Sequence, residues 1–401
     1  MKRIMILGAT VVQMPLINMA KSFGYYVAVC DWTTTSPGIA VADSHHQVNI
    51  LDKDLVLKAA KEEKIDGIIS NYDPAMPIVA YVSEQLGLIG NSSDGIETLN
   101  SKAKFRELQR ESGLYFPQSI TSVELEDFMS QVSSLTYPII IKPCKSSATR
   151  GTKKFEKFDE RGLKESFEEC HKLSVNDIVC AEEYVEMPSL NIIDGDVFVY
   201  GDDIIWDGMF MSTRSPYAPM VPTTQTYPLS VKPEQYNIVK ESLTAIFKNA
   251  GVKFGEYNVE MYFNKDGKLF VIEINPRQGG NGIPSAILRH CGIDFTKLLV
   301  TLAVGDTFYY EEVKNLQYDK ILICRHPVYC HETGTFKEIS IAEEIKQYIS
   351  GIEILKQNGD EIRGCVNALD EVGFINLEFD SNEVQLKYAY NLEKYITVKL
   401  S

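Results

Sequence analysis

The chain has 401 residues, of which 44% are hydrophobic and 24% charged, and this length favours two or three domains. Its formal net charge of −15 disfavours nucleic acid as a partner, because binding there depends on neutralising phosphates. No apolar run is long enough to cross a bilayer, and the stretch before Gly8 is too short for a signal peptide, so we expect a cytoplasmic protein with no membrane partner.

Residues 1–95 alternate short apolar strands with helices. Strands are expected at 3–7, 25–30 and 67–70, and helices at 14–20, 55–63 and 78–86. This alternation predicts parallel strands joined by crossover helices. The loop 8–13 lacks the pattern Gly-x-Gly-x-x-Gly, so we assign no dinucleotide site to it. Asp73 follows one strand, where ligands of such sheets bind, and is a candidate substrate contact, although a polar loop cap explains it equally well.

Two lysines in the next part of the chain could hold phosphates. Lys102 begins an expected helix at 102–112, where the helix dipole disfavours a cation unless an anion lies nearby. Lys142 ends an expected strand at 137–142 and precedes the loop 144–151, whose small hydroxyl residues and backbone N–H groups could wrap phosphate oxygens. A solvated lysine at a strand end also explains Lys142. A further strand is expected at 178–185.

The strongest local pattern is a hairpin around Asp266-Gly267. This dipeptide between two alternating runs predicts a two-residue turn in which Lys265 pairs with Lys268. Counting outward places four polar residues on one face and an apolar set on the other: Glu260 opposite Glu273 and Asn258 opposite Asn275, against Val259, Met261, Phe263, Phe270, Ile272 and Ile274. Facing carboxylates repel unless a cation lies between them, and oxygen ligands without His or Cys suit Mg²⁺. A solvent-exposed polar face explains the pattern equally well.

The segment after the hairpin contains a further cation. Arg277 precedes the glycine-rich stretch 278–282, and its guanidinium suits a developing phosphoryl charge or a carboxylate. Gly279 and Gly280 would let a ligand approach the backbone closely. Arg214 lies in a loop-like stretch, 212–216, that could reach the substrate. Asp73, Arg214, Arg277, Gly279 and Gly280 are therefore the candidate substrate contacts.

Together these residues resemble the ATP-grasp superfamily over about residues 1–310, most closely its carboxylate–amine (L-amino-acid) ligase branch. The resemblance implies an ATP site at Lys102, Lys142, Ser146, Ser147, Gly151, Glu182, Glu183, Tyr184 and Val185. It implies Mg²⁺, with Mn²⁺ as a substitute, on Glu260, Glu273 and Asn275, and it gives catalytic roles to Lys142 and Arg277. Ser189 stands near the place where relatives often carry a ribose-binding glutamate, so we expect Ser189 at the nucleotide.

The resemblance also implies a fold class of α/β and α+β parts. It divides the chain into a Rossmann-like N-terminal domain at 1–95, a linker helix and first ATP-grasp subdomain at 96–187, a second subdomain with the metal site at 188–310, and a C-terminal α+β segment at 311–401. The substrate would lie partly on the first of these domains.

The implied activity is an ATP-dependent ligase that forms a C–N bond. ATP would phosphorylate a small carboxylate, such as that of an amino acid, and an amine would attack the acyl phosphate, with release of ADP and phosphate. Two alternatives stay open: an enzyme of purine or carbamoyl-phosphate metabolism that uses bicarbonate or formate, and a non-catalytic ATP-binding sensor. The expected partners are small molecules, and a homodimer also stays open.

Overall fold

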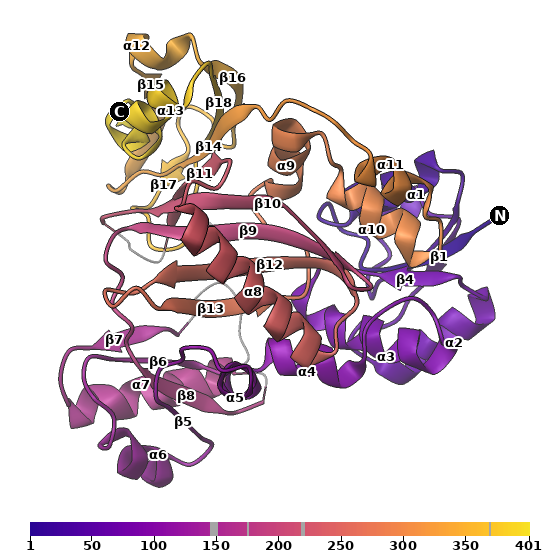
Figure 1. Cartoon of the computed structure of the whole chain (residues 1–401), viewed down its shortest axis with the longest axis horizontal. Helices are drawn as coiled ribbons and strands as arrows, with labels where there is room; N and C mark the ends of the chain where they lie inside the picture. Colours follow the sequence, from indigo (N-terminus) through magenta and orange to yellow (C-terminus); the bar gives the residue numbers. More distant parts are fainter. Residues whose placement is uncertain (145–150, 175, 218–220, 369) are drawn as a thin grey trace.

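A computed structural model describes residues 1–144, 151–174, 176–217, 221–368 and 370–401. Figure 1 shows an N-terminal unit on one side of a large central sheet, a smaller sheet below it and the C-terminal segment above it. Among the described residues, none of the helices is both long and apolar enough to cross a membrane. The candidate ligand-binding residues come from several of these units, so we expect the site where the units meet.

The N-terminal unit is a parallel sheet in the order β3-β2-β1-β4, as the alternation predicted. Its elements are β1 (Arg3–Leu7), α1 (Met14–Ser22), β2 (Tyr26–Cys30), η1 (Pro37–Ala40), β3 (Ser44–His46), α2 (Lys53–Glu63), β4 (Gly67–Ile69), η2 (Asp73–Ala75) and α3 (Met76–Leu86). The apolar strands β1 and β2 are almost fully buried. Asp52 starts α2 by accepting hydrogen bonds from the backbone of Asp54 and Leu55, and Gly87 in the left-handed conformation ends α3.

The smaller sheet is antiparallel, with the order β5-β8-β6-β7. This part of the chain comprises α4 (Ser93–Asn100), α5 (Lys102–Glu111), β5 (Ser119–Ser122), α6 (Leu125–Val132), β6 (Ile139–Pro143), β7 (Lys153–Phe155), α7 (Glu160–Leu173) and β8 (Val179–Glu183). Helices α6 and α7 bury Phe128, Leu163 and Phe167 against Ile139 and Ile141 of the sheet. Residues 145–150 of the loop predicted to wrap phosphates, which include Ser146 and Ser147, lie outside the described residues.

The central sheet has the order β13-β12-β9-β10-β11-β14-β18-β16 and is antiparallel throughout. Its first strands are β9 (Asn191–Tyr200), β10 (Asp203–Arg214), β11 (Pro222–Tyr227), β12 (Phe254–Phe263) and β13 (Leu269–Asn275). Arg214 was expected in a loop, but it is the last residue of the long strand β10. Side chains from β9 and β12 on one face pack against α8 (Pro233–Ala250), which lies across these strands in Figure 1.

The hairpin β12–β13 differs from its prediction in an informative way. Phe263 pairs with Leu269, so the turn is five residues long rather than two, and the pairing of Lys265 with Lys268 is wrong. Asn264 organises this turn, because its side-chain oxygen accepts from the backbone of Asp266 and Lys268 at 3.0 Å each. A register shift follows between Glu260 and Met261, and it offsets the longer turn.

The register shift confirms one half of the hairpin prediction and overturns the other. Glu260 pairs with Glu273, and Asn258 pairs with Asn275, as predicted. Phe270 and Ile272, however, pack with Tyr262 in a separate small cluster, not with Val259 as predicted. Because of the shift, the side chains at positions 269 to 272 lie on the faces of the hairpin opposite to those predicted.

The C-terminal segment adds strands to the central sheet and also forms a small sheet of its own. The remaining elements of the chain are α9 (Ile283–Cys291), α10 (Phe295–Ala303), α11 (Phe308–Lys314), β14 (Leu322–Val328), β15 (Gly334–Ile341), α12 (Glu343–Lys346), β16 (Ile349–Ile354), β17 (Glu361–Ile362), β18 (Gly373–Phe379), α13 (Asn382–Ala389), η3 (Leu392–Lys394) and β19 (Ile396–Leu400). Strands β14, β18 and β16 continue the large sheet, and β17-β15-β19 form a small one. Helices α9 and α10 share one core with the N-terminal unit and with Phe198 and Phe210 of the central sheet, so they join the two parts.

Candidate active site

The predicted metal ligands lie together on the face of the hairpin that points away from α8. Glu260 and Glu273 are partly buried, and the Asn275 amide donates to a Glu273 carboxylate oxygen at 3.2 Å. In the part of the chain that the structure describes, no group of three or more His, Cys, Asp or Glu is arranged to hold a metal ion. Two carboxylates and one amide oxygen fit a hard cation such as Mg²⁺ only when phosphate oxygens and waters complete the coordination.

The two facing carboxylates differ electrostatically. Burial raises the pKa of Glu260, although Arg214 donates to it at 2.7 Å and favours its charged form. Burial also opposes ionisation of Glu273, but Lys102, Asn275, Lys142 and Arg277 outweigh it and lower the pKa of this carboxyl. All three cations predicted to hold phosphates therefore act on Glu273.

These three cations come from separate parts of the chain. Lys102 is the first residue of α5, as predicted, and Lys142 lies on β6 with its ammonium bound to Glu182. Arg277 follows β13, and its Nε donates to Asp73 Oδ1 at 2.7 Å. Asp73, predicted to contact the substrate, thus ties the N-terminal unit to the loop after β13.

The glycine loop after Arg277 needs its small residues. The backbone N–H of Gly279 donates to Asp196 at 2.8 Å, and a Cβ on Gly279 would lie 2.5 Å from Ile283 and 2.7 Å from Asp196. A Cβ on Gly280 would meet none of the described atoms within 4 Å, so this side of the loop is open to a ligand. Arg214 forms an ion pair with Glu260 at 2.7 Å and lies 3.8 Å from Asp194.

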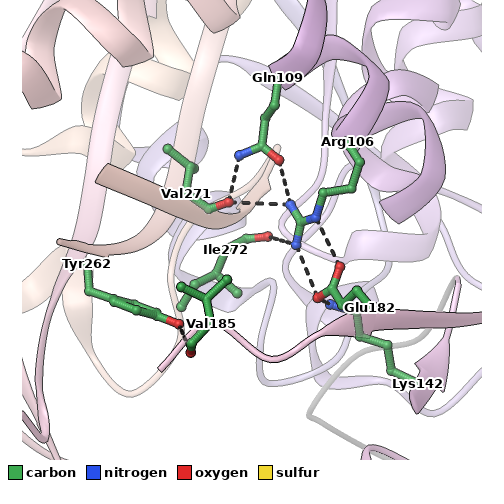
Figure 2. A network of polar contacts seen from close by, with 8 residues as sticks. All are labelled: Arg106, Gln109, Lys142, Glu182, Val185, Tyr262, Val271 and Ile272. Atoms are coloured by element: carbon green, nitrogen blue, oxygen red, sulfur yellow. Dashed lines mark hydrogen bonds and ion pairs between the residues drawn. The ribbon is translucent and has the colours of Figure 1, made fainter. Parts of the chain in front are cut away.

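The segment predicted to contact adenine begins at the end of β8 and is held by a network of hydrogen bonds and ion pairs. Glu182 is buried and bound to Lys142 and Arg106, while Glu183 accepts from the Thr136 backbone at 2.8 Å. The Tyr184 backbone donates to Pro138, and the Val185 carbonyl accepts from the Tyr262 hydroxyl at 2.6 Å (Figure 2). These bonds fix the backbone from 183 to 185 between the two sheets.

The remaining nucleotide candidates have local partners. The Ser189 hydroxyl accepts from the backbone of Asn191 at 3.2 Å, so it supports the turn before β9. Gly151 has a positive φ of 73°, and its carbonyl accepts from the Cys170 thiol at 3.1 Å. Ser146 and Ser147 lie outside the described residues, and their predicted contacts with phosphate stay predictions.

Known proteins resemble this chain in sequence and fold. The family model described as the C-terminus of D-ala D-ala ligase matches residues 112–303, which include the hairpin, Lys142 and the Glu182 segment. An L-amino acid ligase from Bacillus licheniformis superposes with a TM-score of 0.78 at 19% identity, over 100% of this chain and 99% of that chain. Residues 112–303, just under half of the chain, match that family model, and the whole chain has the fold of ATP-grasp enzymes. ATP-grasp enzymes are typically ATP-dependent ligases that bind ATP with Mg²⁺.

Other ATP-grasp relatives carry different chemistry. The carbamoyl phosphate synthase large chain of Campylobacter jejuni is 23% identical over 314 residues, covering 74% of this chain but 27% of that protein. The biotin carboxylase domain of a Hydrogenobacter thermophilus 2-oxoglutarate carboxylase, solved with MgADP and bicarbonate, has a TM-score of 0.67 at 18% identity, over 99% of this chain and 91% of that chain. The chain spans 27% and 51% of the first two curated relatives, so their full activities do not transfer.

Several buried polar residues of this ATP-grasp site were not predicted. Burial and Glu260 raise the pKa of Asp194 to about 7 against the effect of Arg214. Burial and Asp196 hold the pKa of Glu256 well above its usual value. Acidic residues inside apolar strands, such as Asp194 and Asp196 in the run 191–199, were the available signal. Arg106 had a weaker signal, because it lies one helical turn after Lys102 on α5.

Proposed function

We propose that the protein is an ATP-dependent ligase that joins a small carboxylate, such as that of an amino acid, to an amine. The observation that carries this proposal is the pairing of Glu260 with Glu273 across the hairpin, with Asn275 bound to Glu273. The charges of Lys102, Lys142 and Arg277 lower the pKa of Glu273 and support it. Three cations around a carboxylate pair match the charge of a nucleotide triphosphate with its metal. A cytoplasmic location, where ATP is available, and the four domain ranges given above belong to the same proposal.

In the proposed reaction, the side chains of this site position charge and form no covalent bond with substrate. Mg²⁺ on Glu260, Glu273 and Asn275 would neutralise and orient the phosphates of ATP when bound. A carboxylate oxygen of the substrate attacks the γ-phosphorus, and the bond from this phosphorus to the bridging oxygen of ADP breaks. Lys102, Lys142 and Arg277 compensate the charge that spreads over the transferred group.

The second step is acyl transfer to nitrogen. The amine nitrogen attacks the acyl carbon, the bond to the phosphate oxygen breaks, and the amine gives its extra proton to solvent. The open side of the loop at Gly280, next to Arg277, is where we assign the acyl phosphate. The backbone from Glu183 to Val185 is where we assign adenine, because its bonds to Pro138 and Tyr262 give it a fixed geometry.

The test of this proposal is the release of ADP in the presence of pairs of amino acids. Glu273→Gln should lower the rate by at least about 100-fold, because it removes an anionic ligand from the proposed metal site. Glu338→Gln is the matched control, since Glu338 pairs with Lys399 at 2.9 Å on the surface with about half of each side chain exposed. Full activity of Glu273→Gln would refute the metal assignment, and nucleotide binding with no turnover on any substrate would favour a sensor.

A second candidate is an enzyme that phosphorylates bicarbonate or formate. The likeness to carbamoyl phosphate synthase and to the biotin carboxylase domain supports it. Under this alternative, ADP release depends on bicarbonate or formate and is independent of added amino acids. Running the same assay with each carboxylate in turn separates the two candidates.

A further inference from the structure

A buried arginine, which is separate from the two lysines proposed to bind the nucleotide, connects the two sheets of the proposed site. Arg106 on α5 donates to Glu182 Oε2 at 3.0 Å, to the Ile272 carbonyl at 3.0 Å and to Gln109 at 2.7 Å (Figure 2). Gln109 donates in turn to the Val271 carbonyl at 2.9 Å. Val271 and Ile272 directly precede Glu273, so this network links the small sheet to the strand that bears the proposed metal site.

Two cations share the single carboxylate of Glu182. Lys142 and Arg106 both contact it, and the side chains of all three are no more than 9% exposed. Burial by itself raises the pKa of Glu182, but Arg106 and Lys142 outweigh burial and lower it to about 2. The carboxylate therefore keeps one counter-ion if the other moves away.

The two cations are not equally able to move. Arg106 is fixed by bonds to Gln109 and Ile272 in addition to those with Glu182, and it lies 5.0 Å from the centre of the Phe270 ring. Lys142 is the penultimate residue of β6, the strand that leads to the predicted phosphate loop. A lysine with a flexible stem is the partner that can exchange one anion for another.

We propose that Arg106 is a positioning residue, the permanent counter-ion of Glu182, which lets Lys142 leave this carboxylate for the phosphates of the nucleotide. This inference rests on the proposed function, in which phosphates bind beside Lys142. Without Arg106, Lys142 is the only cation among the described residues that contacts this buried carboxylate, and nucleotide binding has to compete with that pair. Arg106 thus acts on nucleotide affinity through Lys142 rather than by touching the nucleotide.

The test is the affinity for MgADP, measured by titration calorimetry on the full chain. Arg106→Met should weaken binding by about 100-fold, the scale of breaking a buried ion pair. The double variant Arg106→Met/Glu182→Gln should recover to within about threefold of Glu182→Gln alone, because Lys142 no longer has a competing carboxylate. Arg106→Lys, which keeps the charge, should bind within about tenfold of the wild type.

The double variant separates this role from simple support of β13. If Arg106 only holds the Val271 and Ile272 carbonyls, the double variant stays as weak as Arg106→Met, and that result would overturn the proposal. Wild-type affinity in Arg106→Met would overturn it too. If Arg106→Met does not fold, as judged by circular dichroism, Arg106→Lys decides, because a folded Lys variant with about 100-fold weaker binding contradicts a role through charge. A wild-type protein that binds no MgADP refutes the proposed function instead.

Discussion

The ion pair between Asp73 and Arg277 gives a sharp prediction, because it joins the N-terminal unit to the loop that follows β13. Arg277 Nε lies 2.7 Å from Asp73 Oδ1, and the two side chains are 20% and 23% exposed. Unit charges about 4 Å apart interact by about 4 kcal/mol at an effective dielectric constant of about 20. Solvent screening at this exposure reduces the net value to about 1–2 kcal/mol.

Asp73→Asn keeps a hydrogen-bond acceptor but removes the charge that aims Arg277. If Arg277 meets the transferred phosphoryl group, losing about 1–2 kcal/mol of its positioning lowers kcat by about 5- to 30-fold. The KM for ATP should change by less than about twofold, because the nucleotide lysines are untouched. The measurement is steady-state ADP release at saturating concentrations of each substrate.

The control is a second ion pair between distant segments. Glu378 on β18 and Arg289 on α9 lie 2.5 Å apart, away from the hairpin, so Glu378→Gln should leave kcat within about twofold. Wild-type kcat in Asp73→Asn would refute the positioning argument. A rise in the KM of the carboxylate substrate alone would instead assign Asp73 to direct substrate contact, as the sequence suggested.

Two further predictions concern the segment that we propose to bind adenine. Tyr262→Phe removes the 2.6 Å hydrogen bond to the Val185 carbonyl, so the KM for ATP should rise by about 5- to 30-fold while kcat stays nearly unchanged. Both constants are measured from the kinetics of ADP release. A fall in kcat as large as the expected rise in KM would contradict a role in adenine binding. The pKa of Glu182 is about 2 in the folded chain against an ordinary value of 4.5, so this carboxylate contributes about 3 kcal/mol of stability above pH 4.5 that is lost as the pH falls towards 2. Glu182→Gln should therefore be less stable than the wild type at pH 6 and approach it at pH 3 in urea titrations, and a constant difference between the two pH values would contradict this origin.

The hairpin shows how far local patterns reach in this chain. Counting outward from an assumed two-residue turn predicted the pairing of Glu260 with Glu273 correctly, although the turn itself was assigned wrongly. The longer turn and the register shift cancel, because each displaces the partner strand by one residue in opposite directions. The pattern of side chains in a hairpin therefore predicts which residues face each other only when the position of every bulge is known.

The contacts that assemble the site were harder to predict. Lys102 and Lys142 were found from their positions at a helix start and a strand end, which are local features. Arg106 and Asp194 were missed, because their roles depend on strands that lie more than forty residues away in the chain: Arg106 reaches Ile272, 166 residues on, and Asp194 faces Glu260. A buried charge in an apolar segment signals a partner, but the sequence does not name it.

The asymmetry of the two facing carboxylates follows from which parts of the fold surround them. Glu260 takes its cation from Arg214, which comes from the same sheet, and burial still raises its pKa. Burial also disfavours the charge of Glu273, but Lys102 and Lys142, which come from α5 and the smaller sheet, help to lower its pKa. A shift of the smaller sheet against the central one therefore acts directly on the charge environment of Glu273, whereas the ion pair of Glu260 with Arg214 lies within the central sheet. Because Arg106 binds both Glu182 of the smaller sheet and the backbone next to Glu273, it limits how far such a shift can go.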